Sequence, residues 1–119
     1  MQIIQIQNQT RPLSQPITAS YCDTFWARFR GLMFKPSLDP NHGLLLVDKK
    51  DNRFDSAIHM LFMTFDIIAV WINSNKMVVD VKYARKGQLM LIPQRPASFV
   101  LEAHPDQFDN FQVGDSINF

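Results

Sequence analysis

Residues 58–72 form an apolar run that constrains the fold of this 119-residue chain more than any other feature. Phe, Ile, Val and Trp dominate the run, and this β-branched and aromatic content favours a strand over the alternative, a buried helix. Such a strand would be apolar on both faces and longer than a usual strand. We therefore expect a bend or bulge near residues 64–66. The run is too short to span a bilayer comfortably.

Shorter stretches on both sides of this run predict further strands. In residues 3–7, Ile and Gln side chains alternate from position 4, which is typical of a half-buried, edge-like strand. Residues 48–55 predict a polar turn, and residues 73–76 predict a hairpin loop. The other predicted strands cover residues 17–21, 43–47, 78–83, 89–92, 98–103 and 115–119.

One helix is predicted over residues 23–31, with Asp23 as its N-cap and Gly31 as its left-handed stop. Arg28 and Arg30 near its end suit the helix dipole. We expect the aromatic side chains of this helix, Phe25, Trp26 and Phe29, to pack in the core rather than stack on a ligand. Residues 105–111 predict a single helical turn.

These elements together predict a mainly β fold in a single domain over residues 1–119. About eight or nine short strands with one or two short helices are typical of an antiparallel β-sandwich or barrel-like fold. No internal repeat or linker divides the chain.

Composition excludes several classes of partner and location. The formal net charge of +1 predicts no binding to nucleic acid or to a membrane surface. Cys22 is the single cysteine, so no intrachain disulfide is possible, and we expect an inert thiol. The N-terminus lacks signal-peptide features, so we expect a cytoplasmic location. No phosphate-binding glycine loop is present, and we expect no cofactor.

Three ionisable residues in apolar surroundings are candidates for acid–base chemistry. His59 lies on the predicted strand with Leu61 and Met63 on the same face, where it is either a general acid or base or a hydrogen-bonded core residue. Asp66 interrupts the apolar run, and it is either at the mouth of a cleft or a turn residue that accepts local backbone N–H groups. Glu102 is the third candidate.

The arginines near the helix end are candidates for ion pairing or anion binding. Glu102 is expected to form a partly buried ion pair with Arg28, Arg30 or Arg95. Arg28 and Arg30 could also hold an anion, but side chains two residues apart on a helix diverge unless the turn at Gly31 redirects one of them.

The sequence predicts no metal site. His59 and Met63, together with Met33, are soft ligands that would suit Cu(I), but core methionines are the favoured interpretation. His42 and His104 lie too far along the chain from His59 for a typical zinc-binding spacing.

The order and spacing of several short motifs resemble one known family over residues 17–119. The family is domain of unknown function 192 (DUF192), which is uncharacterised. Its Arg-x-x-Gly-Leu-Met signature resembles residues 28–33, and its Ile-His-Thr-Phe-Phe-Met-Arg-Phe variant resembles residues 58–65. The remaining matches are Gly43-Leu44-Leu45-Leu46, Val100-Leu101-Glu102 and Val113-Gly114-Asp115.

The resemblance implies a compact β-sandwich-like domain with a short helix, and it implies no activity. It points to Arg28, Gly31, Met33, His59, Met63 and Glu102 as the positions that match family motifs. The family usually continues with Pro-Ile/Leu-Asp, which falls here on residues 66–68. Ile68 therefore occupies the usual carboxylate position. Either Asp66 replaces that carboxylate with a shift of roughly 6–7 Å along the strand, or the acidic function is absent.

The leading functional hypothesis is a small-molecule-binding or accessory module. Its cleft would lie between the helix end at residues 28–33 and the strand region at residues 59–66. The candidate ligand-binding residues are Arg28, Arg30, Met33, His59 and Met63.

Two alternatives belong to other functional classes. The first is a hydrolase-like enzyme that uses His59 with Asp66 or Glu102 as general acid and base. The second is a protein-interaction module that pairs through an exposed edge strand at residues 3–7. The sequence predicts no particular oligomeric state.

Overall fold

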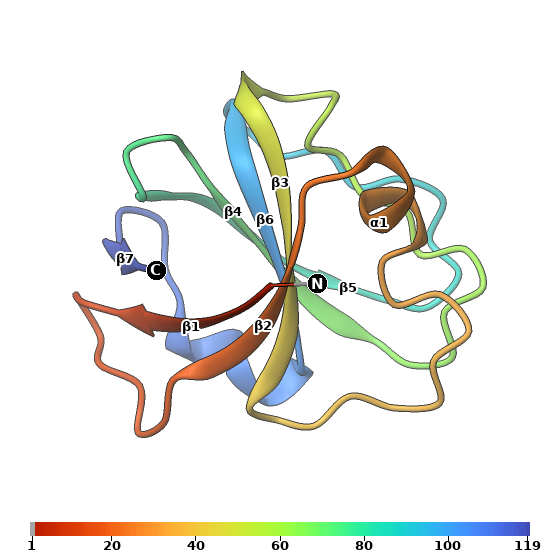
Figure 1. The fold of residues 1–119 in the computed structure, drawn as a ribbon, viewed down its shortest axis with the longest axis horizontal. Coiled ribbons are helices and arrows are strands. Elements are labelled where there is room, and N and C mark those ends of the chain that lie inside the picture. The colour runs from red at the N-terminus through yellow and green to blue at the C-terminus, as the bar shows by residue number, and fades with distance from the viewer. Residues whose placement is uncertain (1) are drawn as a thin grey trace.

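The computed structural model describes residues 2–119, so Met1 lies outside the described part, as does the Phe25 side chain for which core packing is predicted. Seven strands and two short helices follow one another along the chain (Figure 1). They are β1 (Ile3–Asn8), β2 (Ile17–Cys22), α1 (Phe25–Arg30), β3 (His42–Asn52), β4 (Ile67–Ile72), β5 (Val78–Ala84), β6 (Ala97–Ala103), the 3-10 helix η1 (Pro105–Asn110) and β7 (Ile117–Asn118).

All seven strands belong to one sheet in the order β5-β4-β6-β3-β2-β1-β7. The mainly β prediction is therefore confirmed. A wholly antiparallel sheet is wrong, because β2 pairs with β3 in parallel, from Thr18 opposite His42 to Cys22 opposite Leu46. A parallel pair needs a crossover connection, which α1 and the loop before β3 provide. The remaining pairs are antiparallel.

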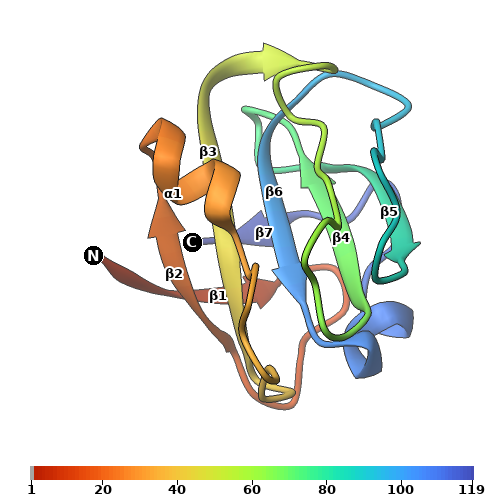
Figure 2. The same cartoon turned by 90° about the vertical axis from the view of Figure 1, so that its right-hand side faces the viewer.

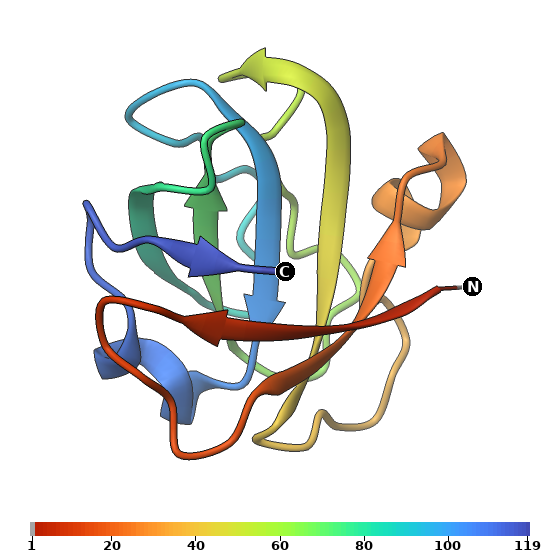
Figure 3. The same cartoon turned by 60° about the vertical axis from the view of Figure 1, so that its left-hand side comes forward.

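The sheet curls so that its β1 end folds over its own centre. In Figure 3, β1 runs across β3 and β6, and β7 runs across β4 toward β6, instead of extending the sheet outward. Accordingly Ile6 on β1 and Ile117 on β7 belong to the same buried cluster as Leu45 and Leu101 on the central strands. The architecture is a single curled sheet, a half-barrel, so it is nearer to the barrel-like form that the sequence allows than to a sandwich of two sheets.

Only the second half of the apolar run 58–72 is a strand. All six residues of β4 are buried, which confirms that this part is apolar on both faces. The first half is irregular: Met60 bonds through its backbone to Gln88 and Gly87, and Phe62 has a φ of 60°. The long strand with a bend near residues 64–66 is therefore wrong, since the backbone partners of the first half lie in the loop after β5.

Most other predicted boundaries differ by a few residues. β3 continues to Asn52, through part of the predicted polar turn at residues 48–55. Residues 89–92 contain only an isolated bridge at Leu91, which helps to explain why seven strands form instead of eight or nine. Thr24 rather than Asp23 caps α1, and its side chain accepts from the Ala27 N–H. The hairpin loop at residues 73–76 and the helical turn at η1 are confirmed.

Each face of the sheet carries its own apolar cluster. One cluster includes Trp71 and Met60 and lies on the face that α1 and the irregular segment of residues 55–66 cover (Figure 2). The other includes Ile6 and Leu45 and lies beneath β1 and β7. None of the helices in the described residues is long and apolar enough to cross a membrane.

Candidate functional site

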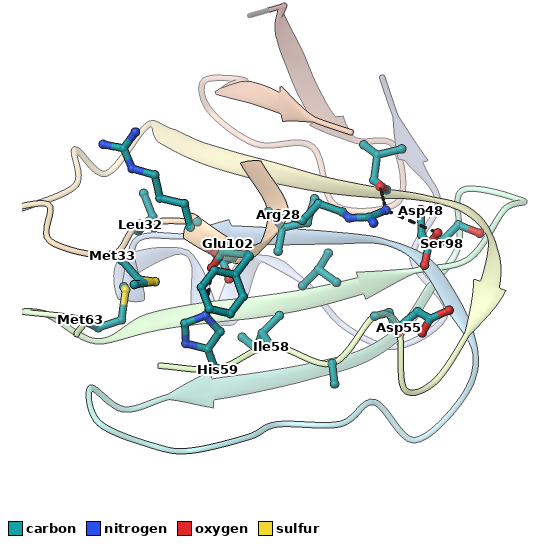
Figure 4. Close-up of a pocket in the computed structure, with 18 residues that line it drawn as sticks. Arg28, Leu32, Met33, Asp48, Asp55, Ile58, His59, Met63, Ser98 and Glu102 are labelled. Atoms are coloured by element: carbon teal, nitrogen blue, oxygen red, sulfur yellow. Dashed lines mark hydrogen bonds and ion pairs between the residues drawn. The ribbon is translucent and has the colours of Figure 1, made fainter. Parts of the chain in front are cut away.

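A cavity of about 390 Å³ lies between the end of α1, strands β3 and β6, and residues 55–63. Figure 4 shows its lining residues, from Met33 and Met63 at one end to Asp48 and Ser98 at the other. This volume falls within the usual range for small-molecule sites, which is roughly 300–1,000 Å³. The sequence-predicted residues that line it are Arg28, Arg30, Met33, His59, Met63 and Glu102.

Glu102 is the acidic side chain on the inner wall of this cavity. Strand β6 alternates, so that Ser98, Val100 and Glu102 face the cavity while Leu101 belongs to the cluster on the opposite face. Glu102 is only 5% exposed, and burial raises the pKa of its carboxyl from 4.5 to about 7. Desolvation is the cause, because a low-dielectric surrounding disfavours the charged form.

No described residue forms a hydrogen bond or ion pair with the Glu102 carboxyl. The predicted ion pair with Arg28, Arg30 or Arg95 is therefore wrong for the part of the chain that the structure describes. Arg28 instead donates to the Val47 carbonyl at 2.9 Å and lies 3.5 Å from Asp48. Arg95 lines a separate hollow beside β5.

The end of α1 closes over Glu102. Gly31 ends the helix with a φ of 48° and a ψ of −124°, a backbone conformation that glycine adopts most easily. A Cβ atom added at Gly31 would lie 3.2 Å from Oε1 of Glu102. Glycine therefore serves two purposes here: it stops the helix and lets its backbone approach the carboxyl group.

Arg28 and Arg30 both line the cavity but do not act as a pair. Arg28 is held against β3 by Asp48 and the Val47 carbonyl, whereas Arg30 is exposed. One guanidinium group is thus already neutralised by an aspartate. The arrangement does not form the two-arginine anion site that the sequence leaves open.

His59 lines the cavity, but both of its ring nitrogens are bonded to backbone. Nε2 lies 2.9 Å from the Phe29 carbonyl, and Nδ1 accepts from the Leu61 N–H at 3.2 Å. These partners require the neutral tautomer with the proton on Nε2. No carboxylate lies within 4 Å of the ring among the described residues. His59 therefore fastens the irregular segment to α1, and the predicted face shared with Leu61 and Met63 on a strand is wrong.

Asp66 lies outside the cavity. Its Oδ1 accepts from the Lys86 N–H at 2.8 Å, and its Oδ2 lies 3.3 Å from the Tyr83 hydroxyl. Asp66 thus accepts a backbone N–H, as one of the two interpretations expects, but the donor is 20 residues along the chain and not local. A pairing of Asp66 with His59 or with Glu102 is absent from the described contacts.

Met33 and Met63 supply a flexible apolar end to the cavity. Both are partly buried, and Met63 packs against the apolar cluster on this face, as the core interpretation expects. Within residues 2–119, no group of three or more His, Cys, Asp or Glu side chains could hold a metal ion. With His59 bonded on both nitrogens, the His–Met set is not free to hold Cu(I).

The Cys22 thiol lies close enough to the cavity floor to be affected by Glu102. Burial, then the charges of Glu102 and Asp23, raise the pKa of this thiol. Its sulfur is 3.6 Å from the Ser20 carbonyl. A raised pKa keeps the thiol protonated, and a protonated thiol is a weak nucleophile.

Several lining residues escape prediction from the sequence. These are Asp48 and Asp55 in the predicted turn, Ser56 directly after it, and Ser98 on a predicted strand, and no motif marks any of them. Trp71 positions one of them, since its indole N–H donates to the Ser56 carbonyl at 2.7 Å inside the core. The alternation of residues 98, 100 and 102 is the one signal that could have identified Ser98.

Four exposed aromatic side chains lie on α1 and in the loops after it, and of these Phe29 lines the cavity. Trp26 is 72% exposed and Phe29 is 48% exposed, so core packing is wrong for both. Phe34 and Phe62 stack with ring centroids 5.2 Å apart, and both have left-handed backbone conformations. A non-glycine residue in that conformation costs free energy, so contacts with the surrounding loops must stabilise the strained backbone.

Sequence comparison identifies relatives over nearly the whole chain. UPF0127 protein TK1120 of Thermococcus kodakarensis is 37% identical over 116 residues, which cover 96% of this chain and 72% of that relative. UPF0127 protein PF1050 of Pyrococcus furiosus is 31% identical over 114 residues, which cover 94% of this chain and 95% of that relative. In two other Thermococcus relatives the match spans only 50% and 62% of their length.

A solved structure shares the fold. The crystal structure of a protein of unknown function from Novosphingobium aromaticivorans superposes with a TM-score of 0.85, covering 100% of this chain and 86% of that chain. At 16% identity this likeness concerns the fold alone. The family model of DUF192, described as uncharacterized ACR, matches residues 3–119, a longer span than the motifs alone indicate. The chain belongs to the DUF192 family.

Proposed function

We propose that this chain binds a small molecule in the cavity beside Glu102. The observation that carries the proposal is a carboxyl group that is 5% exposed, faces the cavity and has no partner among the described residues. Its oxygens are open to the cavity, because no fully enclosed side-chain oxygen or nitrogen in the described residues lacks a hydrogen-bond partner. A ligand donor in the cavity can therefore reach this carboxyl and form a charge-assisted hydrogen bond with it.

The chemistry of the walls supports this proposal. Leu32, Leu46 and Val100, with the two methionine side chains, offer an apolar surface to the body of a ligand. Small-molecule sites usually combine such a surface with a few polar groups that fix orientation. Glu102 on the wall and the Arg28–Asp48 pair at one end are polar groups of this kind.

The two alternatives have less support. An acid–base enzyme needs His59 beside a carboxylate, but both nitrogens of His59 contact backbone atoms instead. An interaction through the edge strand needs an unpaired β1, but β1 pairs with β2 along Ile3–Ile6 and with β7 at Gln7 and Asn8. Neither alternative has an observation that favours it over ligand binding.

The methionines provide a direct test of occupancy. We expect some ring-sized compounds from a fragment library to shift the ¹³C-methyl NMR signals of Met33 and Met63 in a saturable way. The signal of Met90, which is exposed and outside the cavity, serves as the internal control. Met33→Trp should fill that end of the cavity and abolish the shift at Met63, whereas Met90→Trp should not. A library in which no compound shifts Met63 selectively would contradict the proposal.

A further inference from the structure

Glu102 lies where the sheet offers its carboxyl no hydrogen-bond donor. Strand β6 is central, and the residues opposite Glu102 on the two neighbouring strands are Leu44 on β3 and Ala69 on β4. Both are apolar and belong to the buried cluster on the cavity face. Gly31 covers one oxygen with backbone and no side chain. The carboxyl is thus enclosed on the protein side and open toward the cavity.

The charged and titratable groups around the cavity do not neutralise this carboxyl. On α1, Arg28 is bonded to β3 and Arg30 is exposed. On β3 and in the irregular segment, Asp48 and Asp55 are negative. The two arginines and the two aspartates balance in formal charge, so Glu102 is the uncompensated acidic group of the lining.

The two remaining titratable neighbours donate no described hydrogen bond to this carboxyl. His59 directs both ring nitrogens at backbone atoms, Nε2 at the Phe29 carbonyl and Nδ1 at the Leu61 N–H. On β2, Cys22 is a buried thiol whose pKa is raised, and Asp23, which follows β2, is exposed and negative. The missing partner of Glu102 is therefore a donor, and a positively charged donor would also compensate the charge.

We infer, building on the proposed function, that the ligand carries a compact cationic nitrogen group, an ammonium or amidinium, that binds the Glu102 carboxyl. Its apolar body lies along Leu32, Met33 and Met63. A charged donor on a carboxylate forms a shorter and stronger hydrogen bond than a neutral donor does, and an amidinium can use both carboxyl oxygens. An anionic ligand would meet a like charge and bind weakest.

Three planar compounds of nearly equal size separate charge from shape: benzamidine, benzamide and benzoate. At about pH 8, titration followed at the Met33 and Met63 methyls should give benzamidine a roughly 10- to 100-fold higher affinity than benzamide. Benzoate should bind weakest. The Glu102→Gln variant should lose the preference for benzamidine and retain benzamide binding.

A matched control removes another carboxylate from the same lining. Asp55 is exposed, so Asp55→Asn should leave the preference for benzamidine unchanged. The buried Met60 methyl, which is fully enclosed in the core, reports whether each variant is folded. A loss of preference in Asp55→Asn that equals the loss in Glu102→Gln would overturn the assignment to Glu102.

The pH dependence adds a second readout. A cation should bind the ionised carboxyl, so benzamidine affinity should fall about tenfold for each pH unit below about 7, where the Glu102 carboxyl becomes protonated. Benzamide affinity should change little, and Glu102→Gln should remove the dependence.

Failure of this inference and failure of the proposed function give different results. If benzamide or benzoate, or only other neutral and anionic fragments, shift Met33 and Met63 as strongly as benzamidine does, the cavity binds ligands but the cationic class is wrong. If no compound in the library shifts these methyls while Met60 reports a folded protein, the proposed function is wrong as well.

Discussion

Glu102 is the residue where stability and the proposed function oppose each other. The other inward residues of β6 are Ser98 and Val100, and both fit their surroundings: Ser98 donates to Asp51 at 2.6 Å, and Val100 is in the apolar cluster. Glu102 has a polar carboxyl in the same row but no hydrogen-bond partner for it in the described residues. Proteins commonly keep such unfavourable groups at binding sites, where the ligand supplies the missing interaction.

The first prediction concerns the pH dependence of stability. In the unfolded chain Glu102 releases its proton near pH 4.5, whereas in the folded protein it keeps the proton to about pH 7. Between these values the folded state binds more protons, so the free energy of unfolding falls as pH rises. The contribution of Glu102 is complete below pH 4.5 and is lost by about pH 7, a change of about 3 kcal/mol at most.

Glu102→Gln has no proton to lose, so it isolates this effect. Urea unfolding at about pH 5 and pH 8 should show the wild type losing roughly 2–3 kcal/mol relative to this variant. Asp55→Asn should follow the wild type. Parallel stability curves for the wild type and Glu102→Gln would show that Glu102 titrates near its ordinary pKa.

The second prediction concerns Gly31. Gly31→Ala should lower the free energy of unfolding by about 1–3 kcal/mol, because it places a side chain in a strained backbone conformation and against Oε1 of Glu102. Gly87→Ala is the control, because Gly87 also has a positive φ but no atom within 4 Å of the added Cβ. Thermal unfolding should show a larger loss at Gly31. Equal losses would mean that the contact with Glu102 costs nothing.

At the scale of elements, the junction between residues 58–66 and β4 decides which polar groups reach the cavity. The first half of the apolar run bonds to the loop after β5, and His59 joins it to α1. Asp66 closes the junction by accepting from Lys86 and contacting Tyr83. The chain then enters β4, and Asp66 is not among the residues that line the cavity.

The third prediction tests this structural assignment of Asp66. Asp66→Ala should destabilise the protein by about 1–2 kcal/mol, since the Lys86 N–H loses its acceptor. Fragment binding at Met33 and Met63 should be unchanged. Asp66→Asn keeps an acceptor oxygen and should cost less than Asp66→Ala. If Asp66→Ala loses fragment binding but unfolds like the wild type, the structural assignment is wrong and Asp66 contributes to ligand binding.

At the scale of the whole molecule, a buried polar network joins the two ends of the chain. Asp115 accepts from the Asn8 side chain at 2.8 Å and from Arg11 at 3.1 Å, and its Oδ2 also accepts the Gln112 N–H. Asn8 and Asp115 are both buried. The network fixes β1 beside β7, and so it closes the curled sheet over its second core.

The fourth prediction follows from this closure. Asp115→Ala should lower the free energy of unfolding by roughly 2–4 kcal/mol, because one carboxylate oxygen accepts from the Asn8 amide, the Arg11 guanidinium and the Gln112 N–H, and of these the Asn8 amide keeps a second acceptor, the Asn110 carbonyl. Asp109→Ala removes an exposed aspartate nearby and should change stability by less than about 0.5 kcal/mol. Urea unfolding measures both. Equal effects would show that the network contributes no more than a surface charge does.

Local patterns in the sequence are sufficient for much of the fold. Residues 78–83 and 98–103 predict β5 and β6 because successive side chains of a strand point to opposite faces, and this periodicity is visible without partners. Both faces of β5 and β6 in fact contact an apolar cluster, which the sequence does not reveal. Gly31 predicts the end of α1 for a similarly local reason, its backbone freedom. The prediction of one long strand over residues 58–72 is wrong because apolar content alone does not distinguish a strand from a buried irregular segment.

For the candidate site, too, the sequence predicts one part and not the other. Sequence motifs single out Arg28, Met33, His59, Met63 and Glu102, and the fold places all five around one cavity. The motifs do not predict the partners of these residues, because an ion pair or hydrogen bond depends on distances between segments far apart in the chain. Arg28 pairs with Asp48 instead of Glu102, and His59 contacts the Phe29 carbonyl instead of a carboxylate.

By itself, then, the sequence determined that the chain is mainly β, where most strands lie, and which residues deserve attention, since these follow from side-chain periodicity and local backbone preference. Tertiary structure alone decided that β2 and β3 run parallel, that the sheet curls over itself, and that Asp66 lies outside the cavity while Glu102 stays buried beneath Gly31. The physical reason is that desolvation and partner choice are properties of surroundings, and those surroundings come from β2, β3, β4 and α1 together.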